Sequence, residues 1–255
     1  MARERADRVL CQQGLARTRS RARDLIQRGR VTVDGKPLRR PGTLLPSDAV
    51  IAIAPGPGFV SRGGEKLDDA LDALAVDVTG AVVVDIGAST GGFTDCVLQR
   101  GARKVYAVDV GHGQLHPTLR ADARIVVREG ANARHLAPSD FDDPIDIVLV
   151  DASFIGLEKL LPAVTRILPM GGRLIALVKP QFEVGKDIAR RARGVIRDGT
   201  ERARAIADAH AAIAAAGLHV IGACDSALPG PKGNVEHFVH AERVATGSSS
   251  AAPRG

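Results

Sequence analysis

Apolar residues recur at two different spacings along the chain, and the change between them divides it into two parts. In the first part they have the spacing of amphipathic helices, over about residues 5–11 and again over residues 18–28. Short alternating runs typical of strands follow, and the Asp34-Gly35 pair between two of them is a hairpin signal. These runs cover residues 30–33, 36–38 and 49–53. The first part is therefore predicted to be a small α+β domain.

The second part alternates between strand-like and helix-like patterns. A first amphipathic helix is expected over residues 65–74. The strand-like runs cover residues 81–86, 104–108, 125–127, 145–150, 173–178, 219–224 and 237–241. The later helix-like runs cover residues 94–100, 157–167 and 201–216. This order predicts an α/β fold with a parallel, doubly wound, Rossmann-like sheet, whose ligand lies at the carboxyl ends of the strands.

Loop-forming residues set the expected domain boundaries. Pro55-Gly-Pro-Gly58 separates the two patterns. We therefore expect a small domain over residues 1–54, a linker over residues 55–60 and a larger domain over residues 61–244. Residues 245–255 are mostly Ser, Ala and Gly, and we expect them to form a disordered tail.

The positive charge of the chain is concentrated in the small domain. The formal net charge is +6, but residues 1–60 hold twelve Arg or Lys against five Asp or Glu, whereas the rest hold 23 against 24. A basic patch confined to one small domain is typical of nucleic-acid binding, although a solvated, solubilising surface has the same composition. The expected phosphate contacts are the arginines of the second helix, namely Arg17, Arg19, Arg21, Arg23 and Arg28.

Several classes of protein are disfavoured by the sequence. No apolar run approaches the roughly 20 residues that cross a bilayer, and the first residues contain no apolar signal segment. The three cysteines, Cys11, Cys96 and Cys224, are far apart and show no CxxC spacing. We therefore expect a cytoplasmic protein without a metal site, and a monomer is favoured over an oligomer.

A glycine-rich turn follows the first strand of the larger domain. Residues 84–93 hold their glycines in a D-x-G-x-x-x-G-G spacing, which differs from the G-x-G-x-x-G of dinucleotide-binding proteins. The next strand ends at Asp109, where a carboxylate is placed to accept hydrogen bonds from ribose hydroxyls. Such a turn can be purely structural, but the combination favours an adenosine ligand without a pyrophosphate, and S-adenosylmethionine fits. The residues expected to bind this cofactor are Asp85, Gly87, Ala88, Ser89, Thr90, Gly91, Gly92, Phe93, Asp109, Asn132 and Asp151.

Four charged residues from distant segments are expected at the carboxyl edge of the same sheet. Asp151 and Lys179 each follow an apolar strand. Glu236 precedes the last strand, and Lys66 lies ahead of the first. Only seven of the 35 basic residues are lysines, and a desolvated lysine can lose its proton near neutral pH whereas arginine cannot. Each residue taken alone could instead form a surface ion pair, but together they predict a catalytic cleft.

These residues and their surroundings resemble a known family. The set Lys66, Asp151, Lys179 and Glu236 is similar to the Lys-Asp-Lys-Glu tetrad of FtsJ-type ribose 2′-O-methyltransferases. Five longer segments are similar to the TlyA family in particular: residues 61–67, 87–93, 111–115, 178–186 and 228–236. The resemblance implies a class I methyltransferase sheet and an N-terminal RNA-binding domain like that of ribosomal small-subunit protein four. It also implies S-adenosylmethionine-dependent 2′-O-methylation of cytidine in ribosomal RNA.

The tetrad suggests how a ribose hydroxyl is activated. We hypothesise that Lys179, in its neutral form, is the general base that removes the 2′ proton. Lys66 and the sulfonium of the cofactor favour that neutral form, whereas Asp151 and Glu236 orient the two lysines. A competing assignment keeps Lys179 charged, so that it stabilises the developing alkoxide.

Further RNA contacts are expected around the cleft. Arg62 is one candidate, and the basic segment 185–194, with Arg190 and Arg191, is interpreted as a loop that closes over RNA. An ordinary exposed loop is equally compatible with that segment. Phe154 and Phe182 are candidates for stacking on a base, with core packing as the alternative.

Two other functions stay open from the sequence alone. The chain could be an RNA-binding scaffold without methyl transfer, which the tetrad and the glycine-rich turn argue against. It could also be a haemolysin, a label that proteins of this family often carry, although the sequence shows no strongly amphipathic apolar helix.

Overall fold

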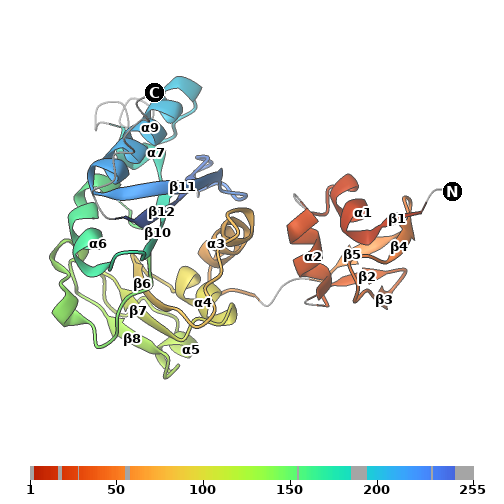
Figure 1. Cartoon of the computed structure of the whole chain (residues 1–255), viewed down its shortest axis with the longest axis horizontal. Coiled ribbons are helices and arrows are strands. Elements are labelled where there is room, and N and C mark those ends of the chain that lie inside the picture. The colour runs from red at the N-terminus through yellow and green to blue at the C-terminus, as the bar shows by residue number, and fades with distance from the viewer. Residues whose placement is uncertain are drawn as a thin grey trace, which may run out of the picture. The chain divides into compact units, whose positions relative to one another are not determined.

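The structure, a computed structural model, describes residues 3–16, 19–27, 29–54, 58–153, 155–184, 194–230 and 232–244. The chain forms two compact units (Figure 1). One comprises Met1–Gly58 with Leu71–Val76, and the other comprises Phe59–Ala70 with Asp77–Gly255. Residues 55–57 of the predicted linker and the whole predicted tail lie outside the described residues.

The smaller unit packs two helices against short strands. Helices α1 (Ala6–Gln12) and α2 (Arg19–Gln27) form where the apolar spacing predicts them. They share one core, whose buried residues include Val9, Leu10, Leu25, Ile26 and Val31. The strands are β1 (Arg3–Arg5), β2 (Val31–Val33), β3 (Lys36–Pro37), β4 (Leu44–Pro46) and β5 (Ile51–Ile53). The order β3-β2-β5 forms one antiparallel sheet, and β1 pairs with β4. The sequence pattern missed β1 and β4, because β1 consists of three charged residues and β4 is two leucines followed by a proline, so neither alternates between apolar and polar residues.

The larger unit contains a seven-stranded sheet in the order β11-β12-β10-β9-β6-β7-β8. Its strands are β6 (Val82–Ile86), β7 (Lys104–Val108), β8 (Ile125–Arg128), β9 (Ile147–Val150), β10 (Arg173–Val178), β11 (Leu218–Asp225) and β12 (His237–Arg243). Its longer helices are α4 (Gly92–Gln99), α6 (Leu161–Ile167), α9 (Gly199–Ala215) and α3 (Arg62–Ala73), whose residues from Leu71 onward belong to the smaller unit. In Figure 1, α6 and α9 lie on one side of the sheet and α4 lies on the other. The α/β sheet predicted from the sequence is confirmed.

One strand runs against the predicted direction. Strands β10, β9, β6, β7 and β8 are parallel, but β12 is antiparallel to both β10 and β11. A parallel neighbour needs a long crossover connection, usually a helix. The residues described between β11 and β12 contain no helix, and the chain therefore returns in the opposite direction.

The helices differ from the prediction in detail. The single helix expected over residues 157–167 is a short 3-10 turn, Leu157–Lys159, followed by α6. Pro162 lies in the first turn of α6, where its missing N–H is tolerated. Two one-turn helices, α5 (Pro117–Arg120) and α7 (Pro180–Glu183), were not predicted because a single turn shows no periodicity. Two further 3-10 turns cover Ala133–His135 and Pro138–Asp140.

The strand register places the predicted site residues at one edge of the sheet. Ile86 of β6 pairs with Val108 of β7 and Val150 of β9, and these strands are parallel. The residues that follow each strand, among them Asp109 and Asp151, therefore emerge at the same edge. Strand β10, parallel to β9, brings Lys179 to that edge as well.

Candidate active site

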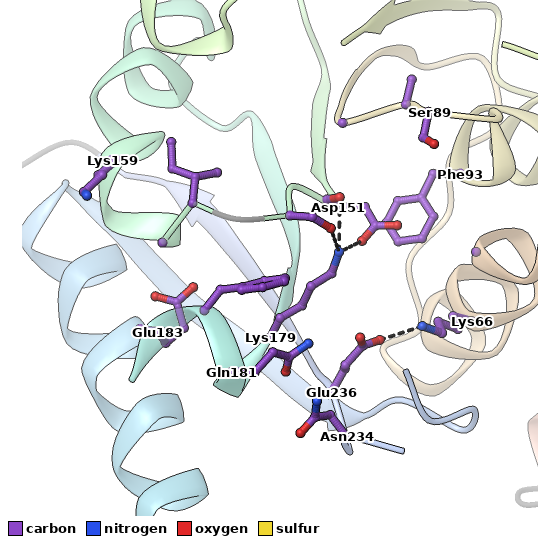
Figure 2. Close-up of a pocket in the computed structure, with 18 of the residues that line it drawn as sticks. Lys66, Ser89, Phe93, Asp151, Lys159, Lys179, Gln181, Glu183, Asn234 and Glu236 are labelled. Atoms are coloured by element: carbon purple, nitrogen blue, oxygen red, sulfur yellow. Dashed lines mark hydrogen bonds and ion pairs between the residues drawn. The ribbon is translucent and has the colours of Figure 1, made fainter. Parts of the chain in front are cut away.

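The four charged residues of the predicted cleft form two ion pairs. Nζ of Lys66 lies 2.6 Å from Oε2 of Glu236, and Nζ of Lys179 lies 2.7 Å from Oδ1 of Asp151 (Figure 2). Lys66 is 8% exposed, Lys179 9% and Glu236 1%. An unpaired charge in such a place is strongly unfavourable, so the pairing is what allows the charges to be buried. The structure thus brings together all four residues of the predicted tetrad.

Lys179 is held by the segment that follows β9. Its Nζ donates a hydrogen bond to Oγ of Ser153 at 2.9 Å and one to the main-chain oxygen of Asp151 at 3.4 Å. With the Asp151 carboxylate, three oxygens lie around the amine: two accept hydrogen bonds, and Oδ1 of Asp151 is its ion-pair partner. These contacts hold the amine at one point of the cleft.

Glu236 is positioned by the turn that precedes β12. Its main-chain oxygen accepts a hydrogen bond from the backbone N–H of Ser226 at 2.9 Å. A Cβ at Gly230 would lie 2.6 Å from Oε1 of Glu236. Only glycine leaves room for the carboxylate there, because any larger residue would force it aside. Gly230, the middle residue of the Pro-Gly-Pro sequence at residues 229–231, is therefore needed for steric reasons.

The glycine-rich turn lies beside these ion pairs. Gly87 has a φ of +86°, and a Cβ there would lie 2.8 Å from the main-chain oxygen of Asp151. Ser89 is also left-handed, with a φ of +47°, and its backbone N–H donates to Oδ2 of Asp109 at 2.8 Å. The backbone N–H of Gly111 donates to Oδ1 of Asp109 at 2.7 Å. Asp109 therefore fastens the turn to the loop that follows β7.

Asp85 lies fully buried beneath the turn. Its Oδ2 accepts hydrogen bonds from the backbone N–H and from Oγ1 of Thr94, at 3.0 and 2.7 Å, in the first turn of α4. Burial raises the pKa of Asp85 to about 7, against the hydrogen bonds from Thr94, and the charges of Asp151 and Asp109 add to the rise. Asp85 thus supports the turn from below.

A cavity of about 1550 Å³ runs from the turn to the ion pairs and beyond. The predicted cofactor-binding residues that line it are Gly87, Ala88, Ser89, Thr90, Gly92, Phe93, Asn132 and Asp151. Within the described part of the chain, Asp85, Gly91 and Asp109 of that set do not line it. Oδ1 of Asn132 accepts from the backbone N–H of Arg134 at 3.2 Å, so this residue also caps a 3-10 turn.

The residues present fit S-adenosylmethionine. The positive φ at Gly87 and Ser89 turns the backbone toward the cavity, and the carboxylate of Asp151, which lines the cavity, suits a ligand that carries an ammonium and a sulfonium. Each oxygen of Asp109 accepts one backbone N–H and can accept a second bond, such as one from a ribose hydroxyl. No group of three or more His, Cys, Asp or Glu among the described residues could hold a metal ion.

The residues predicted to bind RNA fall in different places. Arg62 lines the cavity and donates to the main-chain oxygen of Pro229 at 3.2 Å. Phe182 lines it too. Arg19 and Arg23 of the smaller unit each contact Oδ2 of Asp7 at 3.1 Å. Outside the described residues lie Arg17, Arg28, Phe154, residues 185–193 of the predicted loop 185–194 (with Arg190 and Arg191), and the side chain of Arg21.

Three polar residues of the site were not predicted individually. Ser153 contacts Lys179, and Gln114 accepts a hydrogen bond from Oγ of Ser89 at 3.1 Å. Oδ1 of Asn234 accepts a hydrogen bond from the backbone N–H of Ile196, and its Nδ2 donates one to the main-chain oxygen of Gly194, each at 2.8 Å. Such residues lie in loops and have no periodicity. The only signal for Gln114 and Asn234 was their place in two of the family-like segments.

Comparisons with known proteins were consistent with this geometry. Residues 59–243 match the model of the FtsJ-like methyltransferases, and residues 4–51 match the S4 domain. The 16S/23S rRNA (cytidine-2'-O)-methyltransferase TlyA of Mycobacterium tuberculosis is 43% identical over 239 residues, which are 93% of this chain and 89% of that protein. Hemolysin A of Brachyspira hyodysenteriae is 37% identical over 238 residues, 92% of this chain and 98% of that protein.

A solved structure agrees with the fold. A hemolysin-named protein from Streptococcus thermophilus has a TM-score of 0.71 at 38% identity, covering 96% of this chain and 90% of that one. Two of these similar proteins thus carry a hemolysin name. Within the described residues of this chain, helices that combine the length and the apolar character needed to cross a membrane are absent.

Proposed function

Because the chain belongs to the FtsJ-like methyltransferase family, and within it to the TlyA proteins, we propose that it methylates the ribose 2′-oxygen of cytidine in ribosomal RNA. The methyl donor is S-adenosylmethionine, and the reaction takes place in the cytoplasm. Of the named relatives, the protein of Mycobacterium tuberculosis acts on cytidine of 16S and 23S rRNA by its name.

The observation that carries this proposal is the position of the two ion pairs. They lie in the same cavity as the glycine-rich turn, so a methyl donor held by the turn and a ribose held by the charged residues would meet. Lys66 and Glu236 form one pair, and Lys179 and Asp151 form the other (Figure 2). Two amines and two carboxylates can together donate to and accept from a ribose, which has both kinds of group.

Residues of the turn hold the methyl donor in this proposal. Gly87 and Ser89 give the backbone its close approach, Asp109 accepts hydrogen bonds from the ribose hydroxyls of the donor, and Asp151 faces its positive end. S-adenosylmethionine, when bound, supplies a methyl group on a positively charged sulfur. Lys66, Lys179 and Glu236 are buried, and their electrostatic contacts are stronger there than they would be in bulk water.

The tetrad activates the acceptor. Nζ of Lys179, in its neutral form, would take the proton of the ribose 2′-hydroxyl, and S-adenosylmethionine bound by the turn would supply the methyl group to the 2′-oxygen. Lys66, held by Glu236, orients the ribose by donating a hydrogen bond to it. Ser153 and Asp151 hold the amine of Lys179 in line.

The competing assignment keeps Lys179 as an ammonium. The three oxygens around its Nζ suit the charged form, which would stabilise the developing alkoxide electrostatically while the proton leaves to solvent. An arginine at this position would keep the charge and remove the base, so one substitution separates the two assignments.

The experiment that tests the function compares ribosomal RNA from cells with and without this protein. A 2′-O-methyl group prevents alkaline cleavage of the following phosphodiester, because the attacking hydroxyl is blocked. We expect one or more cytidines to be resistant to alkali only when the protein is present. Identical cleavage patterns in both RNAs would rule out the proposal.

A further inference from the structure

In the smaller unit, one fully buried carboxylate binds three arginines. Oδ1 of Asp7 accepts from Nε of Arg5 at 3.0 Å. Oδ2 accepts from Nη2 of Arg5 at 3.2 Å, from Nη2 of Arg19 at 3.1 Å and from Nε of Arg23 at 3.1 Å. The side chain of Asp7 has no exposed surface, whereas those of Arg5, Arg19 and Arg23 are 46%, 48% and 49% exposed. Only the positively charged side of the cluster is therefore exposed to solvent.

The carboxylate does not neutralise the cluster. Burial alone would raise the pKa of Asp7, but hydrogen bonds from Arg5, Arg23 and Arg19 more than offset it and hold the pKa well below its usual range. Three guanidinium charges against one carboxylate leave an excess of positive charge. Each guanidinium has five N–H donors, of which the bonds to Asp7 use only one or two.

The fold positions Asp7 independently of the arginines. Its backbone N–H donates to the main-chain oxygen of Pro41 at 3.1 Å, in the segment between β3 and β4. A Cβ at Gly42 would lie 3.3 Å from Nη1 of Arg5, so glycine leaves this guanidinium its space. Arg5, at the end of β1, and Arg19 and Arg23, on α2, thus converge on an anchored point.

We propose that Asp7 is a positioning residue for RNA binding, which holds Arg5, Arg19 and Arg23 together so that they contact one backbone phosphate of RNA. The proposal rests on the proposed function for RNA as the source of the phosphate. Guanidinium groups that share a fixed carboxylate have already lost part of their conformational entropy, so less is lost when a phosphate binds. An acidic residue is then required for the binding of an acidic ligand.

If Asp7 is required, removing its negative charge should change RNA affinity in the direction opposite to that expected from net charge. Asp7→Asn removes one buried negative charge and so makes the net charge of the smaller unit more positive by one, which by itself should strengthen RNA binding. If Asp7 positions the arginines, the same substitution should weaken binding, because the neutral amide holds guanidinium groups less firmly. Asp48→Asn is the matched control, since Asp48 is an exposed carboxylate of the same unit outside the cluster.

The test is a fluorescence-anisotropy titration of a labelled RNA hairpin with the full-length protein at several salt concentrations. We expect Asp7→Asn to bind about fivefold or more weakly, with a salt slope smaller by about one, because one phosphate contact is lost. Asp48→Asn should bind as tightly as the unsubstituted protein or more tightly. Equal or tighter binding by Asp7→Asn overturns the proposal.

A second variant keeps the test decisive if Asp7→Asn does not fold, which a thermal unfolding curve will reveal. Arg23→Lys keeps both the charge and Asp7 but removes the fork geometry of the guanidinium, and it should also weaken binding. Unchanged binding by a folded Arg23→Lys overturns the proposal. Failure of the proposed function can be distinguished from failure of this proposal. If the proposed function is wrong, the unsubstituted protein binds RNA but does not methylate ribosomal RNA.

Discussion

Val178 of β10 and His237 of β12 lie opposite each other in antiparallel register. The residue that follows the first, Lys179, and the residue that precedes the second, Glu236, therefore leave the sheet at the same edge. Strand β9, on the other side of β10, brings Asp151 to this edge in parallel register. Helix α3 supplies Lys66 across from them. Three strand ends and one helix thus form the charged part of the cavity.

The first test separates the two roles of Lys179. If the residue is the general base, Lys179→Arg should lower the single-turnover rate of methyl transfer by about a hundredfold or more, a typical contribution of such catalysis. Lys104→Arg, a substitution on β7 outside the cavity, is the control and should keep the rate. An Lys179→Arg enzyme with the rate of the unsubstituted protein would show that Lys179 acts through its charge.

The second test concerns Ser153. Ser153→Ala removes one hydrogen bond to Nζ of Lys179, and we expect kcat to fall about three- to tenfold, which corresponds to one hydrogen bond. Because Ser153 acts through the amine, the pH at which the rate is half-maximal should also shift, whereas KM for RNA should stay constant. If both kcat and the pH of the half-maximal rate are unchanged in Ser153→Ala, Ser153 does not have this role.

The third test addresses the methyl donor. Asp109→Asn removes the carboxylate proposed to accept hydrogen bonds from the ribose of S-adenosylmethionine, and calorimetric titration should show about tenfold weaker binding, as for one bond to a charged group. Asp122→Asn is a suitable control, because Asp122 is a carboxylate bound to Arg124 away from the cavity. Equal affinities of the two variants would exclude Asp109 from the donor site.

The fourth test uses two glycines with similar backbones. Gly87 and Gly80 have φ values of +86° and +73°, but a Cβ at Gly80 meets no atom within 4 Å, whereas one at Gly87 lies 2.8 Å from Asp151. Gly80→Ala should cost about 1 kcal/mol in the free energy of unfolding, from backbone strain alone. Gly87→Ala should cost more and should also weaken binding of S-adenosylmethionine. If the two variants unfold at one temperature, the close approach at Gly87 has no importance.

The fifth test follows from the buried carboxyl of Asp85. Its folded-state pKa, about 7, lies above the ordinary aspartate value of 3.8, so the folded protein binds its proton more tightly than the unfolded chain does. The resulting stabilisation is fully present below about pH 4 and is lost as the pH rises toward and through about 7. Asp85→Asn cannot ionise, so its melting temperature relative to that of the unsubstituted protein should rise between about pH 5 and pH 8. A constant difference would show that Asp85 does not titrate in this range.

Much of the larger unit could be predicted because its strands are continuous apolar runs. Such runs show where a strand ends, and Asp151 and Lys179 were placed correctly for this reason. The direction of β12 was not predictable in this way, because an apolar run does not show in which direction a strand runs. The only indication of its direction was that no helix pattern lies between the last two strand-like runs.

Contacts between distant residues were beyond the sequence pattern. Ser153 and Lys179 are 26 residues apart, and Arg19 and Arg23 lie 12 and 16 residues from Asp7. Arg19 and Arg23 were predicted as phosphate contacts from charge alone. That a buried carboxylate gathers them could not be predicted, because Asp7 has no feature in the sequence that distinguishes it from a surface residue.

The most direct test of the account locates the methyl group that the purified protein transfers. Ribosomal RNA is incubated with the protein and S-adenosylmethionine carrying a radioactive methyl group, then hydrolysed with alkali, and the labelled products are separated. If the protein methylates the ribose of cytidine, label will appear in alkali-resistant dinucleotides that begin with cytidine, and none will appear when Lys66, held by Glu236 across the cleft, is replaced by Ala. Label in mononucleotides, where only a methylated base would remain, would contradict it.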